Sequence, residues 1–306
     1  MIIVNIMGGL GNQMSQYAIA RKLSLILGVD FKLDLITNKF YKKDLVHTYQ
    51  LNNFNVVENC ATKDEINKFI RKGKFFFKLV NQVKRSLGMK VDKNIIYNKN
   101  CYIEPMPQMY REEILRLQDN TYLMGYFASF KYINDIRDII LNDFSLKNPL
   151  SEKGAEVIEQ IRNTNSVSIH FRRGDFLTHP DFKDRAAAVN SDEYYYKAVE
   201  YVAKNVENPH FYIFSDEIDY LKENFRIEYP VTYMDFNPPQ RGYEDMYLMS
   251  QCKTNILSGI SSFSCWAAYL NQNQNKLVVI PQASANNDYY PYPHVQISSE
   301  GVCNAV

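Results

Sequence analysis

Two adjacent arginines follow an apolar, β-branched run in the stretch HFRRGD, residues 170–175. Desolvating Arg172 and Arg173 together is costly, so each guanidinium group needs a carboxylate, a phosphate or water as its partner. The preceding residues VSI are typical of a buried strand. The pattern therefore predicts an anion site at the end of a strand.

A serine-rich stretch, GISSFS at residues 259–264, is a second candidate for anion binding. Ser261, Ser262 and Ser264 surround the expected N-terminus of a helix. Free backbone N–H groups and the positive end of the helix dipole suit a phosphate. Simple N-capping by Ser261 or Ser262 is the alternative interpretation. Because the arginines independently call for an anion, we favour a phosphate at this helix.

The N-terminal turn GGLGN joins a strand-like run to an expected helix. Gly8, Gly9 and Gly11 permit either a tight crossing of the chain or the close approach of a substrate, with Asn12 presenting its amide. The spacing is not the G-x-G-x-x-G of a dinucleotide site, and no P-loop lysine follows. Both interpretations of the turn stay open.

Hydrophobic periodicity predicts the elements that position these groups. IIVNIM, a helical run and DFKLDL begin the chain as a βαβ unit. After residue 148, apolar strands alternate with amphipathic helices, which is typical of a parallel, doubly wound sheet. Ligands bind beyond the carboxyl ends of such strands, where HFRRGD, SDE and GISSFS all fall. We expect an α/β fold with two Rossmann-like domains, residues 1–147 and 148–306.

Composition excludes several classes of protein. The net charge of +1 gives no overall field for binding nucleic acid. The five cysteines are scattered and lack zinc-ligand spacing, which argues against a disulfide framework or structural zinc and favours a reducing compartment. No segment approaches the about 20 apolar residues that cross a bilayer. We expect a cytoplasmic protein.

The segment 63–99 differs from the rest of the chain in charge, with eleven Lys or Arg against three Asp or Glu. Its apolar residues recur at helical spacing among the lysines. A basic amphipathic helix can lie on an anionic membrane surface, here the inner face. The alternative, which we favour, is that the apolar stripe packs on its own domain while the lysines are solvated.

Several blocks resemble, in order, those of the inverting α1,2-fucosyltransferases. They are GGLGNQMSQYA, GYFASFKY, HFRRGDF, FYIFSDE and EDMYLMSQCKTNILSGISSFSCWAAYLN. The resemblance runs from residue 6 to about residue 281 and is weak over 37–120. It implies a GT-B-type fold whose domains face each other across a cleft, with the acceptor on the first and GDP-fucose on the second. It also implies inverting transfer to the 2-hydroxyl of a terminal β-galactoside, without a metal or other cofactor.

The resemblance also implies roles for individual residues. Arg173 would bind the donor diphosphate, with Arg172 in support. The other donor contacts that it implies are Asp175, Asp216, Asp245, Ser261, Ser262 and Phe263. The carboxylates could instead cap helices or pair with the arginines.

The implied chemistry agrees with the residue types. Breaking the sugar–phosphate bond builds negative charge on GDP, which an arginine and a helix N-terminus can stabilise without Mg²⁺. The acceptor hydroxyl must also lose a proton. His170, Asn12 and Asp34 all stay open as groups that orient or accept it, although we favour His170 as a histidine that holds its loop.

The chain departs from the family pattern at several positions. Gly259 and Ile260 precede the serines, Cys265 stands at the first expected Trp, and Thr254 and Ala128 replace a common His and Gln. AAAVNSDEYY also lacks the usual His-Gly-x-Cys. The residues expected to bind phosphate are intact, whereas the acceptor cannot be identified.

We expect an enzyme that builds a surface glycan such as an O-antigen repeat, on an acceptor that could be lipid-linked. Two other hypotheses stay open. The first is a transferase of the same fold that uses another nucleotide sugar. The second is a sugar-nucleotide binding protein without catalysis.

Overall fold

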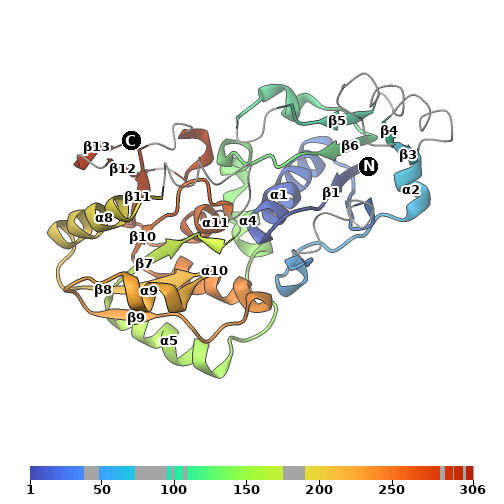
Figure 1. Ribbon diagram of the computed structural model, residues 1–306. Coiled ribbons are helices and arrows are strands. Elements are labelled where there is room, and N and C mark those ends of the chain that lie inside the picture. The colour runs from blue at the N-terminus through green and yellow to red at the C-terminus, as the bar shows by residue number, and fades with distance from the viewer. Residues whose placement is uncertain are drawn as a thin grey trace, which may run out of the picture.

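The computed structural model describes residues 1–37, 48–72, 95–97, 100–105, 109–174, 190–282, 287–291, 293–298 and 301–305. Asp175, one of the expected donor contacts, lies outside them. Figure 1 shows two sheets on either side of a pair of helices, α1 (Leu10–Leu27) and α11 (Ser262–Leu270). This arrangement confirms the expected fold class, α/β with two Rossmann-like halves.

The first sheet has four parallel strands in the order β2-β1-β6-β5. They are β1 (Ile2–Asn5), β2 (Phe31–Asp34), β5 (Cys101–Ile103) and β6 (Thr121–Met124). Because the strands are parallel, their carboxyl ends share one edge, from which the glycine turn leads into α1.

The second sheet has seven strands in the order β13-β12-β11-β10-β7-β8-β9, all paired in parallel except β12 with β13. Their bounds are β7 (Asn165–Phe171), β8 (Pro209–Ser215), β9 (Val231–Tyr233), β10 (Thr254–Ile256), β11 (Leu277–Pro281), β12 (Val295–Ser298) and β13 (Gly301–Ala305). Since β7 lies between β8 and β10, the loops that follow these three strands are neighbours.

Helices cover both faces of the second sheet because side chains alternate along its strands. Phe211 and Ile213 of β8 pack toward α8 (Asp192–Asn205) and α9 (Ile218–Asn224). Tyr212 and Phe214 belong to the core that contains α5 (Glu152–Asn163), α10 (Gly242–Gln251) and α11. The remaining helices of the described residues are α2 (Lys63–Asn67), α4 (Arg137–Asp143) and the 3₁₀ turns Leu51–Asn53, Glu112–Arg116, Phe130–Tyr132, Asn134–Ile136, Pro239–Arg241 and Asn287–Tyr289.

One hydrophobic core runs from the first half of the chain into the second. Phe130 stacks on Tyr269 of α11 with ring centroids 4.4 Å apart, and Trp266 Nε1 donates to Ser15 Oγ of α1 at 2.9 Å. The two halves are therefore held together by α1 and α11. The boundary expected at residues 147 and 148 falls in the connection between α4 and α5 and stays a prediction, as do the roles given to the two domains.

The helical pattern expected over 63–99 is confirmed for α2 and wrong for the described residues after it. After α2, the chain forms an antiparallel pair of strands, β3 (Ile70–Lys72) and β4 (Ile95–Tyr97). Ile66, Phe69 and Ile70 are buried against the first sheet, so packing decided their conformation rather than helical spacing. Residues 73–94 lie outside the described residues, and membrane contact through this segment stays a prediction.

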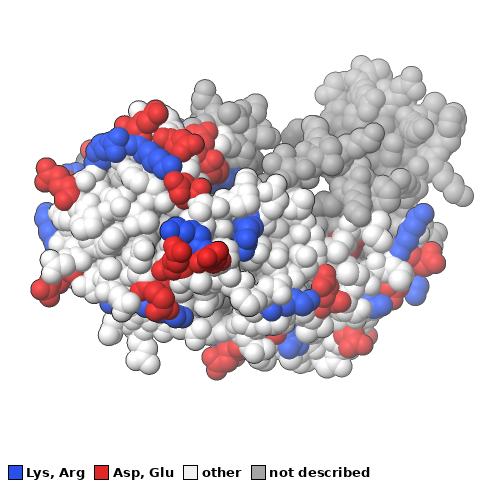
Figure 2. Space-filling model, turned by 90° about the horizontal axis from the view of Figure 1, so that it is seen from below, with Lys and Arg blue, Asp and Glu red and all other residues white. Residues whose placement is uncertain are grey.

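Charge is mixed on the face of the molecule seen in Figure 2. There, basic and acidic side chains are interspersed and form no extended area of one sign. Within the described ranges, no helix has the length and apolarity needed to cross a membrane.

Candidate active site

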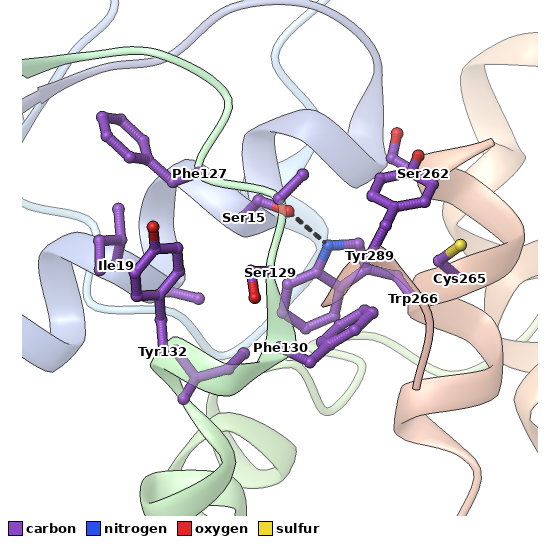
Figure 3. A pocket seen from close by; sticks show the side chains of 13 residues that line it. Ser15, Ile19, Phe127, Ser129, Phe130, Tyr132, Ser262, Cys265, Trp266 and Tyr289 are labelled. Carbon is purple, nitrogen blue, oxygen red and sulfur yellow. Dashed lines mark hydrogen bonds between the residues drawn. The ribbon is translucent and has the colours of Figure 1, made fainter. Parts of the chain in front are cut away.

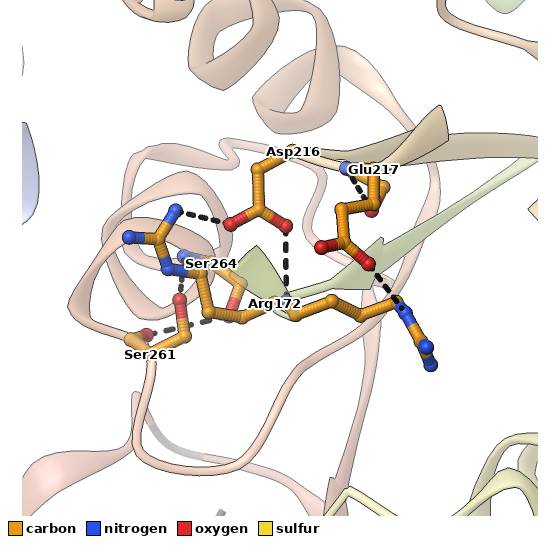
Figure 4. Close-up of polar contacts among 7 residues, drawn as sticks. Arg172, Asp216, Glu217, Ser261 and Ser264 are labelled. Carbon is orange, nitrogen blue, oxygen red and sulfur yellow. Dashed lines mark hydrogen bonds and ion pairs between the residues drawn. The ribbon is translucent and has the colours of Figure 1, made fainter. Parts of the chain in front are cut away.

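The arginine pair is held by a carboxylate from the neighbouring strand end. Asp216, the residue after β8, accepts from Arg172 Nη1 at 2.7 Å, as Figure 4 shows. It also accepts from the Arg173 backbone N–H at 2.9 Å. A Cβ atom on Gly174 would lie 2.8 Å from Asp216 Oδ2, so the loop packs tightly on this carboxylate. Asp216 is thus a partner of both arginines, one of the alternatives considered for it.

The Arg173 side chain is fixed at two further points. Its Nε donates to Glu217 Oε2 at 3.1 Å, and its guanidinium carbon lies 3.8 Å from the centroid of the Tyr220 ring. Among the described residues, its two Nη atoms have no hydrogen-bond partner. A planar guanidinium group held in this way can present two N–H donors to a diphosphate.

The serine block forms the capped start of α11. Ser261 is the N-cap, and its Oγ accepts from the Ser264 N–H at 3.5 Å. The preceding Ile260 adopts φ 57°, which costs free energy for a β-branched residue. Asn190 supports this turn because its Oδ1 accepts from the Gly259 N–H at 2.6 Å. Capping is therefore present, and phosphate binding at Ser261 and Ser262 stays a prediction.

The glycine turn of the first half lies directly against the serine block. A Cβ atom on Gly11 would come 2.5 Å from the Ser262 carbonyl carbon and 2.8 Å from the Phe263 nitrogen. Gly8 adopts φ 76°, and Gly9 is the N-cap of α1. The positive φ explains a glycine at position 8, and close backbone packing explains one at position 11. The structure thus brings the glycine turn and the serine block into contact.

His170 connects the arginine loop to the serine block. Its ring stacks on Phe263 with centroids 5.3 Å apart, and the residue exposes 5 % of its surface. Burial, and secondly the charge of Arg172, lower the pKa of His170 to about 3. His170 is therefore neutral near pH 7, which suits a ring that positions Phe263.

Asp245 lies in the first turn of α10, where Asn237 Nδ2 donates to its Oδ1 at 2.7 Å. Burial raises the pKa of Asp245 to about 7, with the Asn237 hydrogen bond opposing the rise and the charge of Glu244 adding to it. The neighbouring Glu244 is fully buried and accepts from the Ser151 N–H at 2.8 Å at the start of α5. Glu244 thus has a structural role, holding the start of α5 to α10. Asp245 is a weaker acid than an ordinary aspartate because its pKa is raised.

The candidates for proton transfer differ in their surroundings. Asp34 is fully buried and accepts from the Tyr122 hydroxyl at 2.6 Å and from the N–H groups of Ile36 and Thr37. These bonds occupy its oxygens, so Asp34 holds β2 to β6. Asn12 lies in the first turn of α1 and is partly exposed.

Two amides of α1 that sequence reasoning did not assign fix the glycine turn. Gln13 Nε2 donates to the Gly8 carbonyl at 2.9 Å. Gln16 Oε1 accepts from the Met7 N–H at 2.9 Å, while its Nε2 donates to the Gly125 carbonyl at 3.0 Å. Their place in the first turns of a helix after a glycine turn is the signal that could have identified them.

A narrow pocket lies where the two halves meet, as Figure 3 shows. Ser15, Phe127 and Ser129 line it from the first half, and Ser262 and Trp266 line it from α11. The pocket therefore touches the serine block on one side. Within the described ranges, no three His, Cys, Asp or Glu side chains gather as metal ligands would, and metal independence stays a prediction.

Comparison with known proteins identifies relatives of this chain. It is 30 % identical to the O-antigen biosynthesis glycosyltransferase WbnK of Escherichia coli, with 90 % of this chain and 92 % of the relative covered. It is 26 % identical to an α-1,2-colitosyltransferase of Escherichia coli, with 98 % of this chain and 99 % of that relative covered. The human galactoside α-(1,2)-fucosyltransferase 1 is 28 % identical, over 48 % of this chain and 42 % of that enzyme.

Among solved structures, the chain resembles the NodZ α-1,6-fucosyltransferase soaked with GDP-fucose, at 13 % identity and a TM-score of 0.49, covering 100 % and 97 % of the two chains. The profile of glycosyl transferase family 11 matches residues 1–290. A match over nearly the whole chain shows that this protein is a glycosyltransferase and belongs to glycosyl transferase family 11.

Proposed function

We propose that this glycosyltransferase moves L-fucose from GDP-β-L-fucose to the 2-hydroxyl of a terminal β-galactoside, with inversion. The observation that carries the proposal is the arrangement of Arg173. Its guanidinium group is held by Glu217 and Tyr220, and its Nη atoms have no partner in the part of the chain that the structure describes. The half-length similarity to a human galactoside α-(1,2)-fucosyltransferase supports the choice of sugar and linkage.

The proposed reaction is a single displacement. The acceptor hydroxyl oxygen forms a bond to the fucose anomeric carbon while the bond from that carbon to the phosphate oxygen breaks. GDP leaves with the electron pair, and the proton of the acceptor hydroxyl passes to solvent. Arg173 and the N-terminal N–H groups of α11 stabilise the charge that develops on the diphosphate, a contribution that rises as the bond breaks. Ser262 and Phe263 would complete the donor site.

A second candidate is transfer of another activated sugar. The relative named α-1,2-colitosyltransferase is covered over 99 % of its length, so the same arrangement could serve a colitosyl donor. Departures at Gly259 and Cys265 fall in or beside the serine block and could change donor choice, whereas Thr254 lies at the amino end of β10.

A donor panel tests the proposal. Nucleotide release is measured with GDP-fucose, a GDP-colitosyl donor and a UDP-sugar, each with and without lactose as a β-galactoside acceptor. We expect release that depends on lactose with GDP-fucose. Release that depends on lactose with the colitosyl donor alone would establish the second candidate.

The same proposal places the enzyme in the cytoplasm, building an O-antigen or similar surface glycan on an acceptor that could be lipid-linked. The similarity to WbnK supports a role in such a pathway. Contact of residues 63–99 with the inner membrane face would then bring the enzyme to its acceptor. Flotation with anionic liposomes tests this contact. Binding that is absent, or unchanged when Lys72, Lys74 and Lys78 are neutralised, would contradict it.

A further inference from the structure

Glu104, directly after β5, is a buried carboxylate with only one of its oxygens satisfied by the described residues. It exposes 9 % of its surface, and its backbone N–H donates to the Met124 carbonyl at 2.8 Å, so it continues the ladder with β6. Its Oε2 accepts from the N–H groups of Tyr126 at 2.7 Å and Phe127 at 3.1 Å. Its Oε1 is buried and has no hydrogen-bond partner in the described part of the chain.

The local backbone is arranged around this carboxylate. Phe127 adopts φ 50°, a strained conformation for an aromatic residue, and its N–H points at Glu104. A Cβ atom on Gly125 would lie 2.4 Å from Glu104 Cβ, so a glycine is required there. The side chain is therefore fixed, and an unpaired acceptor atom in a fixed, buried position is costly unless a ligand or a water molecule supplies a donor.

Neighbouring side chains leave further polar atoms unpaired. Tyr102 precedes Glu104 by two residues, so both project from the same face of β5. The Tyr102 hydroxyl and Arg111 Nε are buried and have no hydrogen-bond partner among the described residues. We call Tyr102, Glu104 and Arg111 the β5 polar cluster.

The β5 polar cluster lies toward the donor side of the molecule. Phe127, whose N–H donates to Glu104, lines the pocket that Ser262 of the serine block also lines, and Figure 3 shows both residues beside it. The first sheet's strands end at this edge, where ligands of parallel sheets bind. The partly exposed Tyr102 ring, which packs against Phe127 with centroids 6.4 Å apart, offers apolar surface for a pyranose ring.

The charges of the cluster identify the class of ligand. Arg111 pairs with Glu113 at 3.3 Å, so the carboxylates of Glu104 and Glu113 outnumber the one guanidinium group. A phosphate would be repelled, whereas a sugar hydroxyl can donate to Glu104 and accept from Tyr102. We propose that Glu104 binds a hydroxyl group of the acceptor sugar and thereby determines acceptor affinity; this rests on the proposed glycosyl transfer.

Glu104→Gln is a sharp test because the N–H groups of Tyr126 and Phe127 will hold the amide oxygen. The amide NH₂ then takes the place of Oε1, so a donor faces the sugar hydroxyl in place of an acceptor. With lactose as acceptor, we expect KM for lactose to rise at least about tenfold and KM for GDP-fucose to stay within about twofold. Glu112→Gln is the matched control, since that side chain is 65 % exposed and pairs with Arg116.

A KM for lactose within about twofold of the wild-type value would overturn the proposal. If Glu104→Gln does not fold, Tyr102→Phe decides, because it removes one unpaired hydroxyl without changing the shape of the core. It should also raise KM for lactose selectively, and an unchanged KM would overturn the proposal.

Calorimetric titration of lactose into the GDP-saturated protein separates this inference from the proposed function. Suppose that the wild-type protein does not transfer fucose, yet binds lactose more tightly than Glu104→Gln does. This result would contradict the proposed donor and leave the role of Glu104 intact. Lactose binding that is equal in wild type and Glu104→Gln contradicts the role of Glu104, whatever the donor.

Discussion

Gly11 in the first turn of α1 lies against Ser262 in the first turn of α11, with room for a hydrogen atom and not for a methyl group. A Cβ atom at Gly11 would lie 2.5 Å from the Ser262 carbonyl carbon. Two motifs separated by about 250 residues are thereby in backbone contact. The glycine turn before α1 thus fixes the position of the N-terminus of α11, the helix expected to bind the donor.

Gly11→Ala should push α1 and α11 apart and destabilise the protein by about 1–3 kcal/mol, as overpacking of a close contact does. Thermal unfolding measures the loss, and kcat/KM should fall with it because α11 moves. Gly242→Ala is the matched control, since a Cβ atom there would lie 3.7 Å from Phe263, an ordinary contact. An unaltered Tm in Gly11→Ala would contradict the close contact.

Arg173→Lys should lower kcat/KM by about 10²–10³-fold, because an ammonium group cannot keep the Glu217 bond and also offer two fixed donors to the diphosphate. Steady-state kinetics with GDP-fucose and lactose measures the change. Arg162→Lys serves as the control, because Arg162 is 55 % exposed and pairs with Glu159. Equal losses in the two variants would refute the role of Arg173.

His170→Phe should keep kcat within about tenfold of wild type if the neutral ring acts by stacking on Phe263. The folded pKa of about 3 lies below the ordinary 6.5, so the unfolded state binds more protons between these values. Wild-type stability should therefore fall as pH drops below 6.5, and the variant should lack this component. A loss of kcat beyond about 10³-fold in a folded variant would indicate that His170 takes the proton instead.

Asp245→Asn should stabilise the protein more at high pH than at low pH. The folded pKa of about 7 exceeds the ordinary 3.8, so the folded state binds more protons between these values and wild-type stability falls as pH rises. The Tm difference between variant and wild type should grow from about pH 4 to about pH 8. Asp219→Asn, at a 90 % exposed side chain, is the control. A difference that shrinks with rising pH would argue against the buried carboxyl.

Turnover should be unchanged when divalent metals are removed, because Arg173 and the N-terminus of α11 are proposed to carry the charge of the leaving diphosphate. Rates are compared after dialysis against EDTA and after Mg²⁺ is restored. A rate that falls with EDTA and recovers with Mg²⁺ would show that a metal ion shares this task.

The fold class and the place of the arginines could be predicted because they depend on local pattern. The run before Arg172 is apolar and β-branched, and it forms β7. An arginine pair at the end of a strand requires anionic partners. The sequence predicts this requirement but does not identify the residues that meet it. Glu217 and Tyr220 could not be assigned, because their contacts with Arg173 depend on the pairing of β7 with β8.

The segment after Lys63 shows the limit of periodicity. Ile66, Phe69 and Ile70 fit a helical stripe, yet the chain turns into β3 after α2. Short apolar runs fit a helix or a strand, and burial against Ile3 and Tyr122 decides between them. Glu104 was missed for a related reason, since a lone carboxylate shows its function only once burial and unpaired atoms are known.

The linkage of the product tests the central claim most directly. The protein is incubated with GDP-β-L-fucose and lactose, and the trisaccharide is analysed by NMR. We predict α-linked L-fucose on the 2-hydroxyl of galactose. A product with fucose at another hydroxyl or in the β configuration, or product formed only from a different activated sugar, would contradict the account.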